Sequence, residues 1–240
     1  WVDAPTLHTA PGLSLNYAAS IPQGDSVFVN GVFAGAFPGI RVEPHWELAT
    51  TEALAYDLNR EVESALILGG GGLSRVRLAY AGGADRAVVF EAHRGIARRI
   101  ANEIEWADLE GFEVSNQSPR VALGRGTSGF DLIHFPTVGE FHGGVGLNAL
   151  GADFLLTRES FAQAMERLSP EGLIVVNCWL DFPARKPLRL LNTLLAAAEA
   201  SGHGDGRSHL SILRGWGAMS FVFSASGFDA ADRDRLLQSC

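Results

Sequence analysis

Four consecutive glycines and one acidic residue are the feature of this sequence most suited to chemistry. Gly69, Gly70, Gly71 and Gly72 follow an apolar run, and Glu91 ends another such run 20 residues beyond Gly71. Glycines at the end of a strand let a ligand lie against the main chain, where the next helix offers free N–H groups. An acid after the neighbouring strand can bind both hydroxyls of a ribose. The pattern predicts a nucleoside-containing ligand.

The spacing of these glycines does not favour a dinucleotide. The third glycine of a G-x-G-x-x-G pattern packs the helix closely onto the strand. Here that position is Ser74 when counted from Gly69, and Arg75 when counted from Gly70. NAD is therefore the weaker interpretation. A tight strand-to-helix turn that binds nothing, with Glu91 as a surface carboxylate, is the alternative.

Strands and helices alternate over most of the chain, as in a parallel sheet that is covered on both faces. The last two predicted strands are separated only by Trp216 and Gly217, so they must be antiparallel. We predict an α/β fold with a doubly wound, mostly parallel, seven-stranded sheet. The closing antiparallel pair suits a sheet that binds S-adenosyl compounds. The predicted strands cover 64–69, 86–91, 120–124, 130–135, 172–180, 209–215 and 218–226, and the main predicted helices cover 73–82, 94–104, 157–168 and 187–202.

The first 44 residues have no helical period and are predicted to form a small β-hairpin appendage. Two short runs are separated by Asn30-Gly31, which is a strong hairpin signal. After residue 45 the period changes, and Leu48, Leu54 and Leu58 are spaced for one face of a helix. We therefore divide the chain into an appendage at 1–44 and a Rossmann-like domain at 45–240.

Composition excludes some functions. The formal net charge is −8 with 19 Lys and Arg residues among 240, so a nucleic-acid surface, which needs clustered positive charge, is not expected. Cys178 and Cys240 provide neither a disulfide framework nor a metal site. No apolar run reaches the roughly 18 residues needed to cross a bilayer. Because the chain begins at Trp1 without an initiator Met, we expect it to be a piece of a longer protein.

Three segments resemble the spermidine synthase-like family, the polyamine aminopropyltransferases among the S-adenosylmethionine-type Rossmann proteins. They are ALILGGGGLSRVRLAYAGGADRAVVFEAHRGIARRI, DFLLTRESFAQAMERLSPEGLIVVNCW and, more loosely, HWELATTEAL. The resemblance implies a methyltransferase-like sheet with a small N-terminal β-domain. It also implies that Gly69 to Gly72 and Glu91 bind decarboxylated S-adenosylmethionine or S-adenosylmethionine, with no metal.

Two positions depart from the family pattern. The adenine-binding acid is expected in LGRGT, but Gly124 or Arg125 occupies its place, and a guanidinium has only donors. The catalytic aspartate after the fourth strand aligns with Pro136 of FDLIHFPTVGEF, which cannot move a proton. His134 and Glu140 are the nearest substitutes as a base. His134 is also expected as a plain core histidine.

Other candidate residues have alternative interpretations. His45, Trp46 and Glu47 match the family's substrate wall, where an aromatic ring and a carboxylate can hold an alkylammonium; packing between the β-appendage and the main sheet is the alternative. His142 precedes a glycine-rich stretch that is either a lid or an ordinary loop. Asp153 and Thr157 precede and open a helix, and Asp153 is either a pocket residue or a capping residue of that helix.

The resemblance leaves three functions open. The first is aminopropyl transfer to a polyamine-like amine, and the second is a non-catalytic nucleoside-binding or assembly domain. The third is an S-adenosylmethionine-dependent methyltransferase. PGLSLNYAASIPQG, RGWGAMSFVFSASGF and RDRLLQSC resemble the soluble domain of bacterial proteins with a multi-spanning membrane region ahead of it. This implies a domain on the cytoplasmic face of the inner membrane, and a homodimer is a further expectation.

Overall fold

The computed structural model describes residues 2–4, 12–29, 32–58, 61–70, 72–124, 127–139, 154–215 and 217–238. A seven-stranded sheet forms the centre, with strands in the order β6-β5-β4-β7-β8-β10-β9. The strands are β4 (Ser64–Leu68), β5 (Arg86–Phe90), β6 (Phe112–Ser115), β7 (Phe130–His134), β8 (Leu168–Trp179), β9 (Leu210–Arg214) and β10 (Ala218–Ser224).

Neighbouring strands are parallel from β6 to β8, and β10 is antiparallel to both β8 and β9. The predicted doubly wound, mostly parallel sheet is therefore confirmed. The strand order reverses between β4 and β7, because the chain runs outward from β4 to β6 and then returns to β7 on the other side. Ligands of such sheets bind beyond the C-terminal ends of the strands at this switch point.

Alternate residues of the central strand β4 pack into two separate cores, one on each face of the sheet. Ala65 and Ile67 belong to one core, and Leu66 and Leu68 belong to the other. The first core is covered by α2 (Ser74–Ala81), α3 (Arg94–Trp106) and α7 (Ala230–Gln238). The second is covered by α4 (Pro119–Gly124), α5 (Arg158–Met165) and α6 (Arg185–Ala200).

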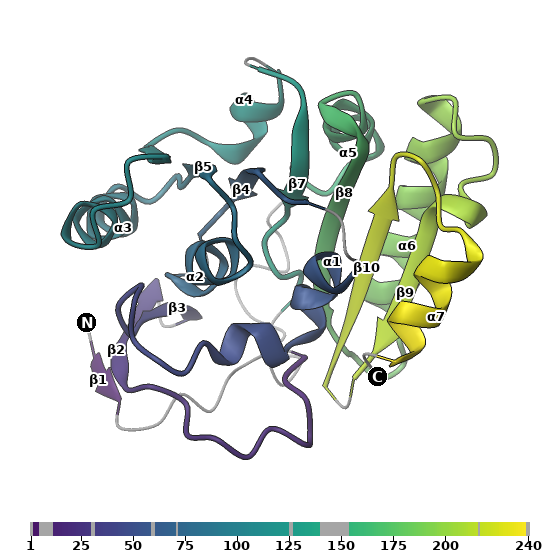
Figure 1. Cartoon of the computed structure of the whole chain (residues 1–240). Coiled ribbons are helices and arrows are strands. Elements are labelled where there is room, and N and C mark those ends of the chain that lie inside the picture. The colour runs from purple at the N-terminus through teal and green to yellow at the C-terminus, as the bar shows by residue number, and fades with distance from the viewer. Residues whose placement is uncertain are drawn as a thin grey trace.

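The N-terminal region forms a second sheet of three antiparallel strands, β1 (Val2–Ala4), β2 (Gly24–Val29) and β3 (Val32–Phe37). The hairpin of β2 and β3 agrees with the prediction, although its Asn30-Gly31 turn lies outside the described residues. Strand β1 was not predicted. This sheet lies beside α2, on the opposite side of the molecule from α6 and β9 (Figure 1).

A connector of three short helices, η1 (Trp46–Ala49), η2 (Thr51–Ala53) and α1 (Leu54–Asp57), joins the two sheets. The single helix suggested by the apolar spacing is wrong here. Thr50 has an extended backbone, with φ −106° and ψ 159°, and interrupts the helical turns. The connector nevertheless packs into the first core through Leu54 and Leu58.

The predicted strand at 120–124 is also wrong, because these residues form helix α4. Pro119 occupies its first position, where a proline is well tolerated, and the carbonyl of Ser118 accepts hydrogen bonds from Val121 and Ala122. The third strand of the sheet is instead β6, which pairs in parallel with β5. None of the helices in the described ranges is long and apolar enough to cross a membrane.

Candidate functional site

The chain turns sharply after β4, at the switch point of the sheet. Gly69 has φ +89°, a conformation that strongly favours glycine, and its N–H donates to the Phe90 carbonyl at the end of β5. A Cβ at Gly69 would lie 3.5 Å from Cβ of Pro136, which follows β7. Gly69 therefore lies between the ends of two neighbouring strands, at the edge where a ligand is expected.

The other described glycines are explained by contacts within the protein. A Cβ at Gly70 would lie 2.6 Å from Cδ1 of Ile100. A Cβ at Gly72 would lie 2.4 Å from the backbone nitrogen and oxygen of Ala36 in β3, and the N–H of Leu73 donates to that Ala36 oxygen over 2.8 Å. Gly72 thus seats the N-terminal sheet on the turn. Gly71 lies outside the described residues.

Glu91 directly follows β5 and is half-buried. Its Oε1 accepts a hydrogen bond of 2.8 Å from the N–H of His93, just before α3. Asn116, which follows β6, donates from Nδ2 to the carbonyls of Glu91 and Ala92. The acid therefore stands at the C-terminal edge beside the glycine turn, with one carboxylate oxygen bound to the main chain. Its role as a ribose ligand stays a prediction.

His134 ends β7 and is 1% exposed, so its imidazole does not reach the surface. Burial lowers the pKa of His134, and the ring is therefore neutral near pH 7. Its Nε2 lies 3.3 Å from Oε2 of Glu52 in the connector. His134 is therefore a buried polar residue. It could touch a substrate only if the surrounding structure rearranged. Glu140, the other predicted base, and His142 lie outside the described residues.

Glu52 and Arg75 form a buried ion pair beneath the glycine turn. Arg75 Nη2 lies 3.3 Å from Glu52 Oε1 and 2.5 Å from Oγ1 of Thr137, while its Nη1 donates to the Gly69 carbonyl over 3.3 Å. Burial alone would raise the pKa of Glu52, but the charge of Arg75 and the contact with His134 outweigh it and hold this pKa at about 2. Glu52 is therefore ionised throughout the physiological range.

A chain of hydroxyl and amide groups continues this cluster into β8 and β10. Thr51 and Ser220 have their hydroxyl oxygens 2.5 Å apart, and Ser220 donates to Oδ1 of Asn177 over 3.0 Å. Asn177 and Ser220 are fully buried. The sequence patterns did not identify this cluster. One signal was present, because Arg75 and Arg77 both stand in a mostly apolar helix behind a glycine turn, although the sequence does not distinguish them.

The predicted substrate wall is mostly internal. Trp46 is 3% exposed, and Glu47 is buried with both carboxylate oxygens on Arg77 of α2, at 2.5 Å from Nε and 3.2 Å from Nη2. Arg77 also donates to the carbonyls of Gly39 and Pro44. In this arrangement Glu47 has no free oxygen for an ammonium group. The geometry matches the alternative of packing between the appendage and the main sheet.

Other predicted positions are located as follows. Gly124 ends α4, and Arg125 lies outside the described residues. Because the third strand is β6, the segment that follows it is Asn116 to Ser118, and not LGRGT. Thr157 opens α5 and caps it by accepting from the N–H of Ser160. Asp153 lies outside the described residues.

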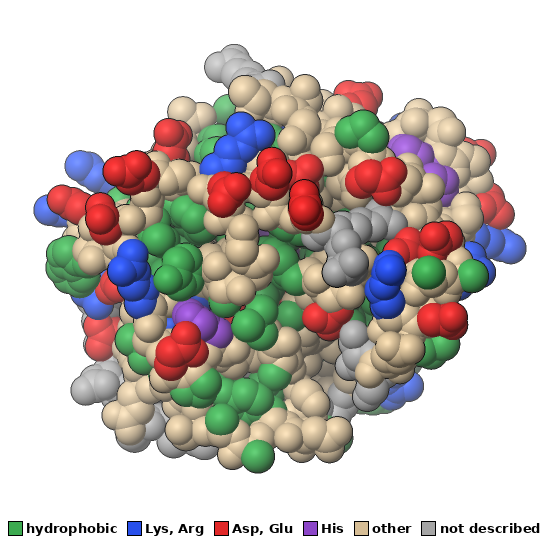
Figure 2. All heavy atoms as spheres, viewed as in Figure 1, with side chains coloured by type: hydrophobic (Ala, Val, Ile, Leu, Met, Phe, Trp, Pro, Cys, Tyr) green, Lys and Arg blue, Asp and Glu red, His purple; other side chains and the backbone are tan. Residues whose placement is uncertain are grey.

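The described residues contain no group of three or more His, Cys, Asp or Glu that could hold a metal ion. Burial raises the pKa of Cys178 to about 12, so this thiol is not a nucleophile at neutral pH. On the face in Figure 2, Lys and Arg side chains are scattered among acidic ones and form no basic patch among the residues that the structure describes.

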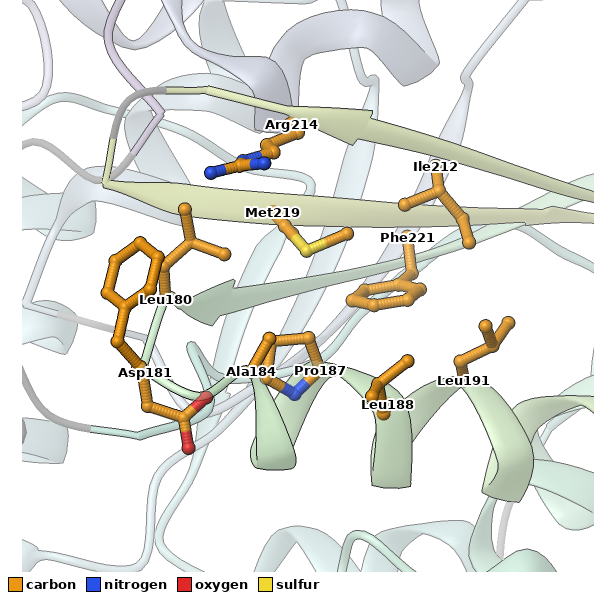
Figure 3. A pocket seen from close by; sticks show the side chains of 11 residues that line it. Leu180, Asp181, Ala184, Pro187, Leu188, Leu191, Ile212, Arg214, Met219 and Phe221 are labelled. Carbon is orange, nitrogen blue, oxygen red and sulfur yellow. The ribbon is translucent and has the colours of Figure 1, made fainter.

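A second concave region lies at the other end of the sheet, between α6 and the strands β9 and β10 (Figure 3). It is an open apolar groove of about 270 Å³. It contains none of the predicted site residues. Its lining includes Leu180, Phe182, Leu188, Leu191, Ile212 and Met219, with Asp181 and Arg214 as its charged members.

No family model matches the chain, and no curated protein matches it. Solved structures do match. A probable spermidine synthase from Corynebacterium glutamicum is 20% identical, with a TM-score of 0.61 over 93% of this chain and 81% of that one. A spermidine synthase in complex with the transition-state analogue AdoDATO is 12% identical, with a TM-score of 0.55 over 86% and 68%. An rRNA methylase from Streptococcus thermophilus is 10% identical, with a TM-score of 0.50 over 74% and 95%.

At these identities the likeness establishes the fold and not the activity. The chain has the Rossmann-like fold of S-adenosylmethionine-type methyltransferases and spermidine synthases, with an N-terminal antiparallel sheet.

Proposed function

We propose that this chain is a spermidine synthase-like domain that binds an S-adenosyl or thioadenosine compound at the C-terminal edge of β4 and β5. The observation that carries the proposal is the placement of Gly69 and Glu91 at the ends of adjacent strands, next to the switch point. The fold supports it, because a spermidine synthase of this fold was solved with the analogue AdoDATO.

The activity we propose first is aminopropyl transfer. An amine nitrogen attacks the aminopropyl carbon next to the sulfonium, a C–N bond forms, and the C–S bond breaks to release methylthioadenosine. The amine must also lose a proton to a base. Because His134 is buried and Pro136 has no titratable group, Glu140 is the base we assign to this step.

One observation favours a second candidate, a non-catalytic nucleoside-binding domain. Pro136 stands beside Gly69, at the position where the family pattern has its catalytic aspartate. The carboxylates of Glu47 and Glu52 are both paired with arginines, so neither is free to receive an alkylammonium. In this candidate the domain binds a nucleoside but does not catalyse a transfer.

The two candidates are separated by measuring binding and turnover on the same preparation. Calorimetric titration with S-adenosylmethionine, its decarboxylated form and methylthioadenosine should give saturable binding of at least one. Glu91→Gln should weaken it about tenfold, while Glu113→Gln, an exposed acid on the next strand, should not. The absence of binding with all three compounds would refute the proposal.

Turnover is measured as methylthioadenosine release from decarboxylated S-adenosylmethionine with putrescine, spermidine and simple diamines. Release that depends on the amine and is lost in Glu140→Gln supports aminopropyl transfer. Binding without release supports the non-catalytic domain. Preferential binding of S-adenosylmethionine over its decarboxylated form would point instead to a methyltransferase.

A further inference from the structure

Arg75 contacts three separate segments that surround the proposed nucleoside site. Its guanidinium donates to the carbonyl of Gly69 in the turn after β4, and to the hydroxyl of Thr137 in the segment after β7. A third contact is the ion pair with Glu52 in the connector. The Arg75 side chain is only 5% exposed, so these contacts are made inside the protein.

Two of these segments are the walls of the switch point. Gly69 belongs to one wall, and Thr137 directly follows Pro136 in the other. The planar guanidinium holds donors in a fixed geometry, so it can set the separation of two acceptors in a way that an ammonium cannot. Arg75 therefore fixes the distance between the two walls from inside the protein.

The third contact anchors this arrangement to the sheet. The second carboxylate oxygen of Glu52 faces His134 at the end of β7, and Thr137 donates to Glu52 over 3.4 Å. Its neighbour Thr51 contacts Ser220 in β10. The counter-ion of Arg75 is thus fixed by two strands of the main sheet, which leaves the guanidinium little freedom to move.

One hydrogen-bond donor of this cluster has no acceptor in the described ranges, which is not expected of a purely structural ion pair. Nε of Arg75 is buried and has no hydrogen-bond partner among the residues that the structure describes. Leaving a buried donor of a charged group unpaired is costly. Arg77, two residues later on the same helix, has no such unpaired nitrogen within the described part of the chain.

We infer that Arg75, with Glu52 as its anchored counter-ion, is a positioning residue of the nucleoside site. This rests on the proposed function for its ligand. Arg75 acts through the Gly69 carbonyl and the Thr137 hydroxyl, because it holds these two groups at the separation that the ligand needs. Arg75 touches no ligand itself. Its removal therefore changes affinity through the geometry of the two walls.

The test compares Arg75→Lys with Arg77→Lys. Each variant keeps a positive charge opposite its glutamate and loses the planar fork. Titrated with methylthioadenosine, Arg75→Lys should bind about tenfold more weakly than the unaltered protein, and Arg77→Lys should bind within about twofold. Equal losses in both variants, or none in Arg75→Lys, would overturn the inference.

A second measurement needs no ligand. The amides of Gly69 and Val138 are hydrogen-bonded to Phe90 and Asn177, so their hydrogen exchange reports on the two walls. Arg75→Lys should speed exchange at both amides about tenfold while the amide of Val222 in β10 keeps its protection. Uniform acceleration, or none at the walls, would contradict a positioning role. If the unaltered protein binds none of the nucleosides, the proposed function fails, and this measurement alone decides whether Arg75 fixes the walls.

Discussion

Two arginines on α2 form ion pairs with two glutamates of the connector, and the pairs differ in how completely they are satisfied. Arg77 is fully buried and donates to both oxygens of Glu47 and to backbone carbonyls. Arg75 meets Glu52 through one nitrogen and makes its other contacts with Thr137 and the Gly69 carbonyl.

This difference separates two regions, the seam between the N-terminal sheet and the main domain, and the C-terminal edge of β4 and β5, where we propose the nucleoside site. The pair of Arg77 and Glu47 closes the seam between the N-terminal sheet and the main domain, where each nitrogen of the guanidinium has an acceptor. The pair of Arg75 and Glu52 lies beneath the switch point and keeps a buried donor unpaired among the described residues. A satisfied buried network makes one arrangement rigid, whereas an unsatisfied one is retained only at a cost in stability.

The largest effect is expected at the seam. Arg77→Met leaves the Glu47 carboxylate buried without a counter-ion, so the free energy of unfolding should fall by about 3–5 kcal/mol. Urea denaturation followed by circular dichroism measures this loss. The double variant Arg77→Met with Glu47→Leu should recover much of it, because no buried charge is left unpaired. A double variant as unstable as the single one would show that the pair is not the seam.

A substitution at Gly72 tests the same seam without changing a residue of either ion pair. Gly72→Ala meets both a positive φ of +65° and the Ala36 backbone at 2.4 Å. Gly204 has a nearly equal φ of +63°, and a Cβ added there would meet nothing within 4 Å, so Gly204→Ala isolates the backbone strain.

Strain alone should cost about 1–2 kcal/mol in Gly204→Ala. The clash in Gly72→Ala should add about 1–3 kcal/mol to that. Thermal or urea unfolding of the two variants gives both values. Equal losses would mean that β3 does not rest on the glycine turn as tightly as the structure indicates.

Most of the fold was predictable, because most strands of the main sheet contain a short apolar run and the long helices α3 and α6 have a clear period, whereas β1 and β6 were missed. The misassigned segment was 120–124, where five residues are too few for periodicity to separate a helix from a strand. The connector failed for a different reason. Its apolar spacing suits a helix, but the β-branched Thr50 interrupts it with an extended backbone.

The site was predictable only where it is local in sequence. The glycine turn and Glu91 each follow a strand, and the order of strands brings those two ends together. The cluster around Glu52 draws on the connector, α2, β7 and β8. No spacing rule links segments so far apart, and Arg75 and Arg77 look equivalent in the sequence. Only their contacts distinguish the edge from the seam.

Acid should lower the free energy of unfolding in two separate pH ranges, one set by His134 and the other by Glu52. Burial lowers the pKa of His134 below its ordinary 6.5, so the unfolded chain takes up a proton there before the folded one does. Stability should therefore fall as the pH drops below about 6.5. The pKa of Glu52 is lowered from 4.5 to about 2, so its contribution is present above 4.5 and is lost between those two values.

Urea denaturation at a series of pH values measures these losses. His134→Asn should remove most of the decline between about pH 7 and 5, because the variant has no imidazole at that position to titrate. It should leave the loss at lower pH in place, since Glu52 still faces Arg75. An unchanged slope in the upper range would assign the acid sensitivity to other groups.

The smallest effect is expected at the outer rim of the seam. His45 Nε2 lies 3.0 Å from Oε1 of Glu43, whose side chain is 72% exposed. A contact whose carboxylate is exposed is screened by water and contributes about 0–1 kcal/mol. Glu43→Gln should therefore change the free energy of unfolding by less than about 1 kcal/mol, and salt should diminish the change further. A loss as large as that of Arg77→Met would mean that even an exposed carboxylate at this rim stabilises the seam, and burial would then not explain why the pair of Arg77 and Glu47 contributes more.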